Sequence, residues 1–468
     1  MIYLQDYTPY SEDYFEEKLK KQSKEVIEYF NGRNLRESLS GNDQGVLVLP
    51  YALNSSLSDA SEEWVLWNYD GEKIRTQNLV GFIGYGKTNI AIGSRFSTFT
   101  SQKYDICQDY FLVYLLQKTL GITLFDSLKS SSSKDSDSAL DFLFLLFPPL
   151  FKKALSQGMF KQYVHRQYND ANIRGVIDVN RHIRFNIPTN GNVAYHTREF
   201  SYDNPVTQLI RHTIEYLRRH AFGKTMLTND VEMRSFVQQI IQATPSYVAN
   251  QRQQVIAQNS RPVSHPLYTH YAMLQQLCLR ILRYEKLSYG ENKKDEKIHG
   301  VLIDINWLWE EYVAQVLSEN SNFEHYTRKE PFELFDKKGV QEIIPDYLGH
   351  DYETGNKIVA DAKYMFLNRD HLPHEKAMAV YYKTIMYMYR FNSNIGLLLY
   401  PYKQEQISND NEIPFVEYRI KETNGKLYKI GLRIPQTAKN LNTFEETIKE
   451  EENSFSKMVQ TQKISKNE

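Results

Sequence analysis

The alternation of apolar and polar residues is most informative between positions 342 and 364, where it predicts two paired strands. The first strand covers residues 342–348, a polar, glycine-containing turn follows, and the second strand covers residues 357–364. Neighbouring side chains on a strand point to opposite faces, so Asp361 and Lys363 share one face. Pairing of the two strands brings Asp346, on the first strand, close to both side chains.

Helical and strand patterns elsewhere predict a multidomain α/β protein. Apolar residues recur at helical spacing over Ser11–Phe30, over Tyr104–Leu120 and through most of residues 139–290, whereas Gly45–Tyr51 and Trp64–Asn68 are typical of strands. The Ser/Lys/Asp-rich segment 127–138 is expected to be a flexible loop. We expect five parts: an N-terminal mixed α/β domain with a β-hairpin (1–126), the loop (127–138), a mostly helical middle region (139–290), an α/β domain with a central mixed sheet flanked by helices (291–437) and a charged C-terminal tail that frays from a surface helix (438–468).

The residue types that the two strands bring together are suited to cutting a phosphodiester bond. Carboxylates such as Asp346 and Asp361 bind a hard divalent cation through oxygen. Such a cation activates water and neutralises charge on phosphate. The amine of Lys363 orients the attacking water or stabilises developing charge. The alternative is a charged hairpin that carries a surface Asp–Lys pair.

A fourth group of the site, a third carboxylate, is expected upstream. The segment that begins at Asp304 is typical of a helix start, with Asp304 or Asn306 as the cap, followed by an amphipathic helix. Either Glu310 or Glu311 would then point from this helix toward the strand pair and complete the metal shell. The alternative for both glutamates is a solvated helix face.

Pro345-Asp346 followed by Asp361-Ala362-Lys363 resembles the PD-(D/E)xK nuclease motif, and the surrounding segments resemble the McrC family, the nuclease subunits of McrBC-type restriction systems. The resemblance covers roughly Val80 to Pro401. The sequence departs from the family pattern at Lys383, where the family commonly has glutamine. Its supporting segments are Gly158–Tyr163, Arg174–Asp178, Asp203–Ile210, Leu308-Trp309-Glu310, Tyr382–Tyr387 and Leu397–Pro401.

The resemblance implies a DNA endonuclease subunit of an anti-phage restriction complex. Mg²⁺, with Mn²⁺ as a substitute, would be held by Asp346, Asp361, Glu310 and the backbone carbonyl of Ala362, while Lys363 would position the water. It also implies a partner, a McrB-like hexameric AAA+ GTPase or ATPase that the N-terminal domain contacts and stimulates, and double-stranded DNA as substrate. The candidate ring contact is a hairpin tip formed by Gly84, Tyr85, Gly86 and Lys87.

The tip also matches a nucleotide-binding motif that the sequence context argues against. Gly81–Thr88 satisfies G-x-x-x-x-G-K-[ST], which in a phosphate-binding loop runs directly into a helix. Here residues 89–96 alternate like a strand, so a hairpin with strands at 79–83 and 88–92 is the simpler interpretation. We therefore expect no nucleotide to be bound by this chain itself.

Charge and composition favour a soluble, cytoplasmic subunit that relies on a partner. The chain has 56 basic and 57 acidic residues and a net charge of −1. Because affinity for DNA comes largely from neutralising phosphate charge, this balance is unfavourable for binding DNA without a partner. Its two cysteines exclude a disulfide framework, and no apolar run is long enough to span a membrane. Two other hypotheses stay open: a non-catalytic adaptor that activates an AAA+ ring and holds DNA, and a self-sufficient repair nuclease. Whether the target DNA is methylated also stays open.

Overall fold

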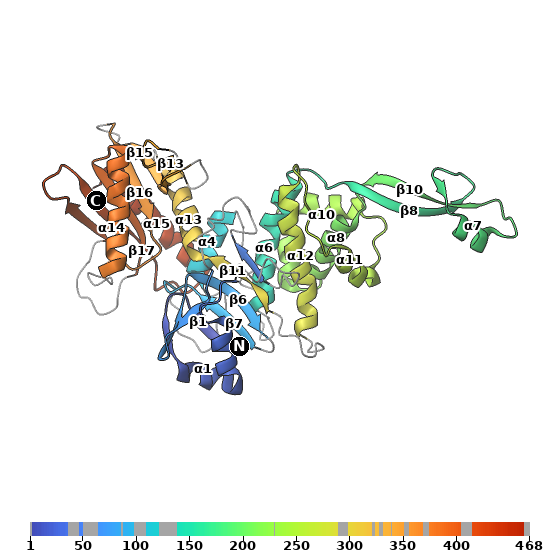
Figure 1. Cartoon of the computed structure of the whole chain (residues 1–468), viewed down its shortest axis with the longest axis horizontal. Coiled ribbons are helices and arrows are strands. Elements are labelled where there is room, and N and C mark those ends of the chain that lie inside the picture. The colour runs from blue at the N-terminus through green and yellow to red at the C-terminus, as the bar shows by residue number, and fades with distance from the viewer. Residues whose placement is uncertain are drawn as a thin grey trace. The chain divides into compact units, whose positions relative to one another are not determined.

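The structure is a computed structural model, and it divides into two compact units (Figure 1). Unit 1 combines Met1–Ile122 with Asp295–Glu468, and unit 2 is Thr123–Lys294. The α/β fold class expected from the sequence is confirmed. The structure describes residues 2–35, 46–49, 64–85, 88–97, 109–120, 138–228, 230–288, 298–320, 323–326, 331–337, 339–350, 355–367, 374–403 and 414–462. Of the predicted loop at 127–138, residues 127–137 lie outside the described residues, and Ser138 begins the helix α6 (Ser138–Leu155).

A five-stranded sheet forms the N-terminal part of unit 1, in the order β1-β7-β6-β11-β3. Its central strand β6 is buried along its whole length, which explains its nearly continuous apolar sequence. The strand β11 comes from far downstream and pairs with both β6 and β3, so it belongs to this sheet. The strands are β1 (Ile2–Gln5), β3 (Val46–Leu49), β6 (Leu79–Tyr85), β7 (Thr88–Gly93) and β11 (Ile298–Asp304).

Two short helices and a small sheet complete this part. The single helix expected over residues 11–30 is two helices, α1 (Glu12–Leu19) and α2 (Ser23–Phe30), because the backbone turns at Lys20 with a φ of 53°. Phe15 and Phe30 pack edge-on against the fully buried Trp67. The small sheet contains β2 (Pro9–Ser11), β5 (Lys73–Thr76) and β4 (Trp67–Tyr69).

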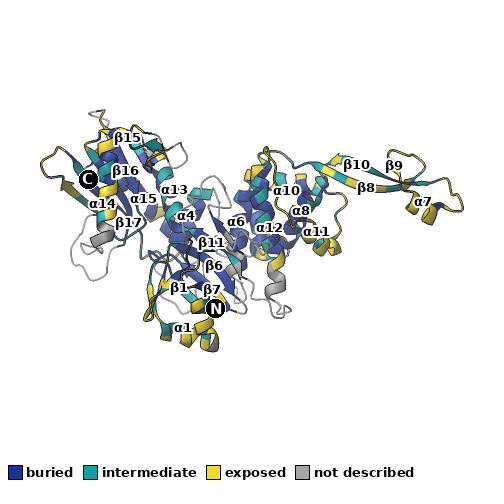
Figure 2. Cartoon of the chain, in the orientation of Figure 1, coloured by how far each residue is buried: buried dark blue, intermediate teal, exposed yellow. Residues whose placement is uncertain are grey.

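The C-terminal part of unit 1 is a six-stranded mixed sheet in the order β12-β15-β16-β17-β19-β18. The central strands β16, β17 and β19 are parallel to one another. All three are largely buried, and Figure 2 shows this for β16 and β17. The helix α14 (His374–Phe391) packs on β16 and β17. The strands are β12 (Glu324–His325), β15 (Tyr347–His350), β16 (Lys357–Ala362), β17 (Ile395–Tyr402), β18 (Phe415–Arg419) and β19 (Lys426–Arg433), with a separate pair β13 (Phe332–Glu333) and β14 (Glu342–Ile343).

The expectation of a fraying C-terminal tail is wrong for residues 441–461, which form the packed helix α15 (Leu441–Thr461). Its apolar face, including Phe444, Ile448 and Phe455, is buried against β19 and against the helices α4 (Tyr110–Leu120) and α13 (Ile305–Asn320). Glu452 is buried too, because it accepts hydrogen bonds from Tyr312 Oη (2.6 Å) and Lys118 Nζ (2.8 Å). The sequence analysis gave weight to the many glutamates of this segment and overlooked the apolar residues that recur at helical spacing between them.

Unit 2 contains a bundle of helices. A capping box at Asn204 begins α8, where the Asn204 side chain accepts from the Thr207 backbone and the Thr207 hydroxyl accepts from the Asn204 backbone. Buried Leu209, Ile210 and Leu277 lie in the apolar stripes expected from the sequence. The helices are α6 (Ser138–Leu155), α8 (Pro205–Leu217), α9 (Ala221–Thr228), α10 (Val231–Ala243), α11 (Arg252–Gln258) and α12 (Thr269–Ser288).

The middle region also holds strands that the sequence analysis did not predict. The strands β8 (Gln162–Asp170) and β10 (Val193–Ser201) pair antiparallel along their whole length, and they carry a short strand β9 (Val176–Ile177) and a helix α7 (Val179–Asn186) at the far end (Figure 1). We call residues 162–201 the arm. Its sequence alternates by single residues, yet both faces carry polar side chains, which obscures the strand pattern.

Among the described helices, none combines the length and the apolar composition that crossing a membrane requires.

Candidate functional site

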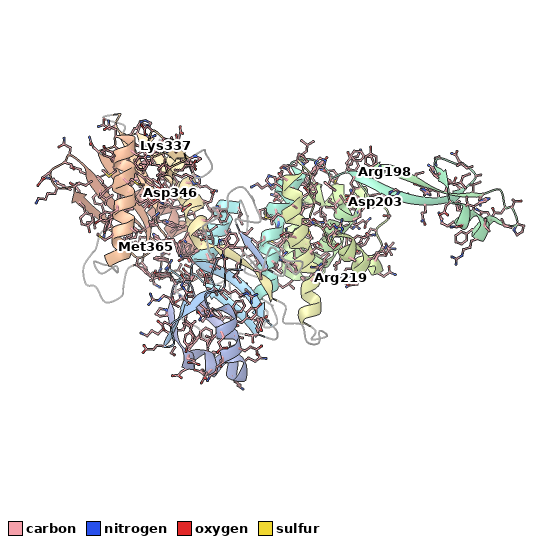
Figure 3. The ribbon with its side chains drawn as sticks, viewed as in Figure 1. Arg198, Asp203, Arg219, Lys337, Asp346 and Met365 are labelled. Atoms are coloured by element: carbon pink, nitrogen blue, oxygen red, sulfur yellow. The ribbon has the colours of Figure 1, made fainter. Side chains whose placement is uncertain are left out.

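The two strands that the sequence predicted do pair, and they place Asp346 opposite Asp361. The antiparallel register joins Tyr347 to Ala360, and Asp346 directly precedes Tyr347. Asp346 Oδ2 accepts a hydrogen bond of 2.7 Å from the backbone N–H of Ala362. Both aspartates are buried, and Figure 3 shows Asp346 within the C-terminal sheet. The first strand differs from its predicted range: it is broken at residues 344–346, between β14 and β15.

Two lysines meet these carboxylates. Lys363 Nζ lies 2.5 Å from Asp361 Oδ2 and 3.9 Å from Asp346 Oδ2. Lys383, the position that departs from the McrC pattern, reaches from α14 to within 3.8 Å of Asp361 Oδ1. Its side chain is 44% exposed, against 21% for Lys363. The structure therefore brings the predicted Asp, Asp, Lys set together and adds a second, more accessible ammonium group.

The electrostatics of the site come from burial and from crowded like charges. Burial, together with the charge of Asp361, raises the pKa of Asp346 to about 7, although both lysines oppose the shift. Burial lowers the pKa of the Lys363 ammonium, but Asp346 and Asp361 outweigh it and hold that pKa above its usual value. Lys363 is therefore a protonated donor at neutral pH.

Glu310 lies on α13, whose first turn is capped as expected. The Asp304 side chain accepts a hydrogen bond of 2.9 Å from the backbone N–H of Asn306. The residue Glu310 is half-buried, but burial of its carboxyl group, followed by the charge of Asp346, raises its pKa well above the ordinary value. The Glu310 backbone carbonyl also accepts a hydrogen bond of 2.5 Å from Tyr347 Oη. The charges of Asp346 and Asp361 both act on the Glu310 carboxyl group, as expected for a third acidic group at this site.

The unsatisfied oxygen atoms of the site suit a divalent cation. Neither carboxyl oxygen of Asp361 accepts a hydrogen bond of good geometry from the residues that the structure describes, although both are buried. Buried carboxylate oxygens with free lone pairs fit a hard cation, and Mg²⁺ commonly uses only one or two carboxylates and keeps several waters. Within the described ranges, no three carboxylate, imidazole or thiolate groups lie close enough together to hold a metal ion in this conformation. The site fits a cation bound by two carboxylates better than a closed cage of three.

The glycine-rich hairpin is not a phosphate-binding loop. Thr88 begins the strand β7 and pairs with Tyr85, so no helix N-terminus follows the glycines. Of the predicted ring contact, Gly84 and Tyr85 are buried within β6, and the Tyr85 ring stacks on Tyr29 at 4.1 Å. Gly86 and Lys87 lie outside the described residues.

The arm is the prominent surface that sequence reasoning missed. Its end exposes apolar side chains that a folded protein normally buries, between 46% and 66% of each being accessible. Arg181 and Arg184 lie within about 6 Å of the Phe185 ring. The exposed apolar residues are Val176, Ile177, Val179, Ile183, Phe185, Ile187 and Ile173. Apolar residues flanked by turn signals between 173 and 187 were the available signal.

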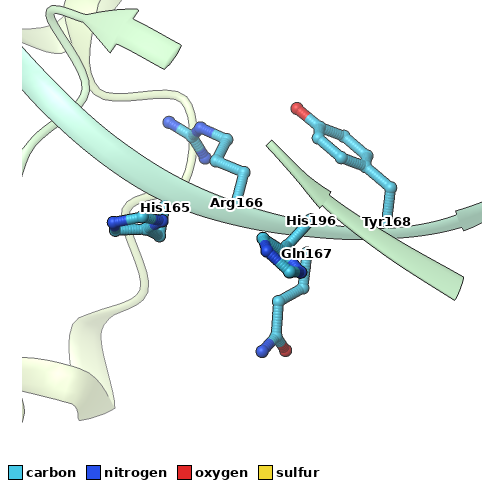
Figure 4. Close-up of a pocket in the computed structure, with 5 residues that line it drawn as sticks. All are labelled: His165, Arg166, Gln167, Tyr168 and His196. Atoms are coloured by element: carbon cyan, nitrogen blue, oxygen red, sulfur yellow. The ribbon is translucent and has the colours of Figure 1, made fainter. Parts of the chain in front are cut away.

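An open pocket of about 570 Å³ lies along the arm, lined by His165, Arg166, Gln167, Tyr168 and His196 (Figure 4). Arg166 is already paired, since its Nη2 lies 3.1 Å from Asp203 Oδ2 at the base of the arm. Figure 3 shows Asp203 where the arm joins the helices and Arg198 further out. We assign no ligand to this pocket.

Comparisons with known proteins agree with the McrC-like motifs. A family model described as McrBC 5-methylcytosine restriction system component matches residues 74–401. One similar structure is a half-complex of Thermococcus gammatolerans McrB AAA+ hexamers with bound McrC, with 14% identity, a TM-score of 0.51 and coverage of 96% of this chain and 99% of that chain. Another is the McrBC complex of the same organism, with 15% identity, a TM-score of 0.31 and coverage of 68% and 87%. No curated protein matches the sequence. Because the family model spans most of the chain, this protein belongs to the family of McrBC 5-methylcytosine restriction system components, as its McrC-like motifs predicted.

Proposed function

We propose that the chain is the DNA endonuclease subunit of a McrBC-like restriction complex, cutting phosphodiester bonds with Mg²⁺. The observation that carries the proposal is the convergence of Asp346, Asp361 and Lys363 at the C-terminal end of the central, buried strand β16. A non-catalytic protein gains nothing from burying two carboxylates that raise each other's energy. Membership of a restriction family supplies the matching substrate, double-stranded DNA.

The roles of the residues follow from their chemistry. Asp346 and Asp361 would hold the cation, with the Ala362 carbonyl and Glu310 nearby. When bound, the cation lowers the pKa of water and neutralises phosphate charge. Lys363 is held protonated by both aspartates, so it orients water or stabilises charge on the phosphate by donating hydrogen bonds and does not act as a base.

The proposed partner is a hexameric McrB-like AAA+ GTPase or ATPase, in line with the McrB hexamers bound to McrC in the similar structure. The exposed apolar side chains of the arm are better candidates for the ring contact than the hairpin tip, half of which is buried. Contiguous exposed apolar side chains are typical of protein–protein interfaces. A net charge of −1 agrees with a subunit whose partner contributes part of the DNA-binding affinity.

The proposal is tested by plasmid cleavage in the presence of the ring partner, nucleotide and Mg²⁺. We expect Asp361→Ala and Lys363→Ala each to reduce cleavage by at least about 10²-fold, the scale of losing one group that stabilises the transition state. Asp336→Ala is the matched control, because Asp336 is exposed in the same part of unit 1. Full activity in both site variants would refute the assignment.

Two measurements separate the alternatives. An adaptor that only activates the ring would bind neither Mg²⁺ nor Mn²⁺ at Asp346 and Asp361, which calorimetric titration of the purified chain detects. A self-sufficient repair nuclease would cut DNA without the partner. We expect metal binding that Asp361→Ala weakens, and cleavage that requires the ring.

A further inference from the structure

A buried segment of the N-terminal sheet contacts the backbone directly after Lys363. We call Ser94–Ser97, which follow β7, the junction segment. The Arg95 guanidinium donates from Nη2 to the carbonyl oxygen of Tyr364 at 2.8 Å. The same guanidinium lies over the Tyr364 ring, 4.6 Å from its centre. Ser94 Oγ and Tyr364 Oη form a hydrogen bond of 2.7 Å.

Arg95 is itself held rigidly from the N-terminal side. Its Nε lies 3.2 Å from Asp6 Oδ2, and its backbone N–H donates to Asp6 Oδ1 at 2.6 Å. Both side chains are almost fully buried. A buried arginine with a carboxylate on one side keeps its planar fork in one orientation. The position of Tyr364 is thus fixed by Arg95 and Asp6, which lie just after β7 and β1 of the N-terminal sheet.

Other contacts tie the junction segment to the same end of the C-terminal sheet. Lys403 Nζ donates to the Ser97 carbonyl at 3.2 Å, and Gln436 Nε2 donates to the Phe96 carbonyl at 3.1 Å. Phe96 packs edge-on against Tyr364, with ring centres 5.0 Å apart. On the sheet side, the Lys363 backbone N–H donates to the Leu399 carbonyl at 2.8 Å. The backbone is therefore held on both sides of Lys363: the peptide before it by Leu399, and the Tyr364 carbonyl after it by Arg95.

We propose that Arg95 is a positioning residue for cleavage: it fixes the backbone that follows Lys363 and so makes the geometry of the catalytic strand depend on the N-terminal sheet. The inference rests on the proposed nuclease function. Reaction rates are steep functions of such placement, since a misplacement of about 1 Å costs roughly 10²-fold. Arg95 itself touches neither aspartate of the site, so its effect passes through Tyr364 and Lys363.

Arg95→Lys tests the proposal, because lysine keeps the positive charge beside Asp6 but lacks the fork that also reaches the Tyr364 carbonyl. Arg33→Lys is the matched control: Arg33 is an exposed arginine that follows α2 in the same N-terminal part of unit 1 and lies over the Tyr29 ring. In the complete complex with Mg²⁺, we expect Arg95→Lys to slow single-turnover cleavage at saturating DNA by about 10- to 100-fold. DNA affinity and stimulation of the ring should stay unchanged.

Hydrogen–deuterium exchange supplies a readout that does not depend on cleavage. In Arg95→Lys, amides of residues 362–367 should exchange faster while the rest of the C-terminal sheet keeps its protection, whereas a merely structural role would raise exchange throughout. Tyr364→Phe, which removes only the bond to Ser94, is the milder variant and should give a smaller loss of the same kind.

The outcomes separate the two proposals. Normal cleavage together with normal exchange in both variants overturns the positioning role and leaves the nuclease function standing. If the wild-type complex itself does not cut DNA, the nuclease function falls, and exchange in residues 362–367 alone decides whether Arg95 holds this backbone.

Discussion

The backbone N–H of Ala362 donates a hydrogen bond of 2.7 Å to the side chain of Asp346, sixteen positions upstream. This bond ties the two carboxylate-bearing strands together at the point where Asp346 faces Asp361. It also leaves the charge of Asp346 close to that of Asp361 in a buried environment, which is unfavourable unless a cation is present. The stability of the site should therefore depend on pH and on divalent metal.

The first prediction concerns pH. The pKa of Asp346 is raised from 3.8 to about 7 in the folded protein, so between these values the folded state binds more protons than the unfolded state. Without divalent metal, the free energy of unfolding should therefore fall as pH rises from about 4 to 7, by up to about 4 kcal/mol from this group. Denaturant unfolding in EDTA measures this slope.

Asp346→Asn should flatten that slope, and added Mg²⁺ at pH 7.5 should raise the melting temperature of the wild type but not of the variant. Asp336→Asn is the control, because Asp336 is an exposed aspartate in the C-terminal part of unit 1. This variant should keep both the pH dependence of unfolding and the stabilisation by Mg²⁺. Equal slopes in wild type and Asp346→Asn would show that the carboxyl does not titrate in this range.

The second prediction concerns Lys383, whose accessible ammonium lies 3.8 Å from Asp361. A lysine at this place is suited to binding a DNA phosphate. Lys383→Gln should weaken DNA binding and reduce the slope of log K against log salt by about 0.9, the value for one phosphate contact. Filter binding or anisotropy over a range of salt concentrations gives the slope. Lys421→Gln, on an exposed turn, is the control and should not change it; an unchanged slope in Lys383→Gln would exclude the phosphate contact.

The third prediction concerns the arm. Phe185→Ser should reduce stimulation of the ring partner several-fold without lowering the melting temperature, because the Phe185 side chain is already half-exposed in the free chain. Val231→Ser, an exposed apolar residue on α10, controls for the loss of any surface apolar group. Nucleotide hydrolysis by the ring, titrated with each variant, reports the effect. If both variants stimulate like the wild type, the arm end is not the contact.

The fourth prediction concerns α15. Glu452 accepts from Lys118, Tyr114 and Tyr312 in the interior of unit 1. Glu452→Ala leaves the mostly buried Lys118 ammonium without this partner, a loss of about 3–5 kcal/mol. Thermal or denaturant unfolding should show a clear drop in stability. Glu450→Ala, two positions away on the exposed face, should change stability by less than about 0.5 kcal/mol.

Local patterns of the sequence determined the elements that carry the site. The alternation around Asp346 and Asp361 predicted the strand pair, and the cap at Asp304 predicted the helix that presents Glu310, because both depend on residues near in the chain. The strand after Gly86-Lys87 likewise argued against a nucleotide loop, and the pairing of Thr88 with Tyr85 confirms the hairpin.

Only the tertiary structure decided the rest, because those features depend on contacts between distant segments. No local pattern shows that Lys383 reaches Asp361 from α14, that β11 joins the N-terminal sheet, or that Arg95 holds Tyr364. The acidic composition of the segment around Glu452 predicts a solvated tail. Only the folded structure shows that Lys118 and Tyr312 donate hydrogen bonds to Glu452 in the interior. Each of these features joins segments that are far apart in sequence. Burying a polar or charged group costs free energy unless a partner is present, and only the folded chain brings these partners together.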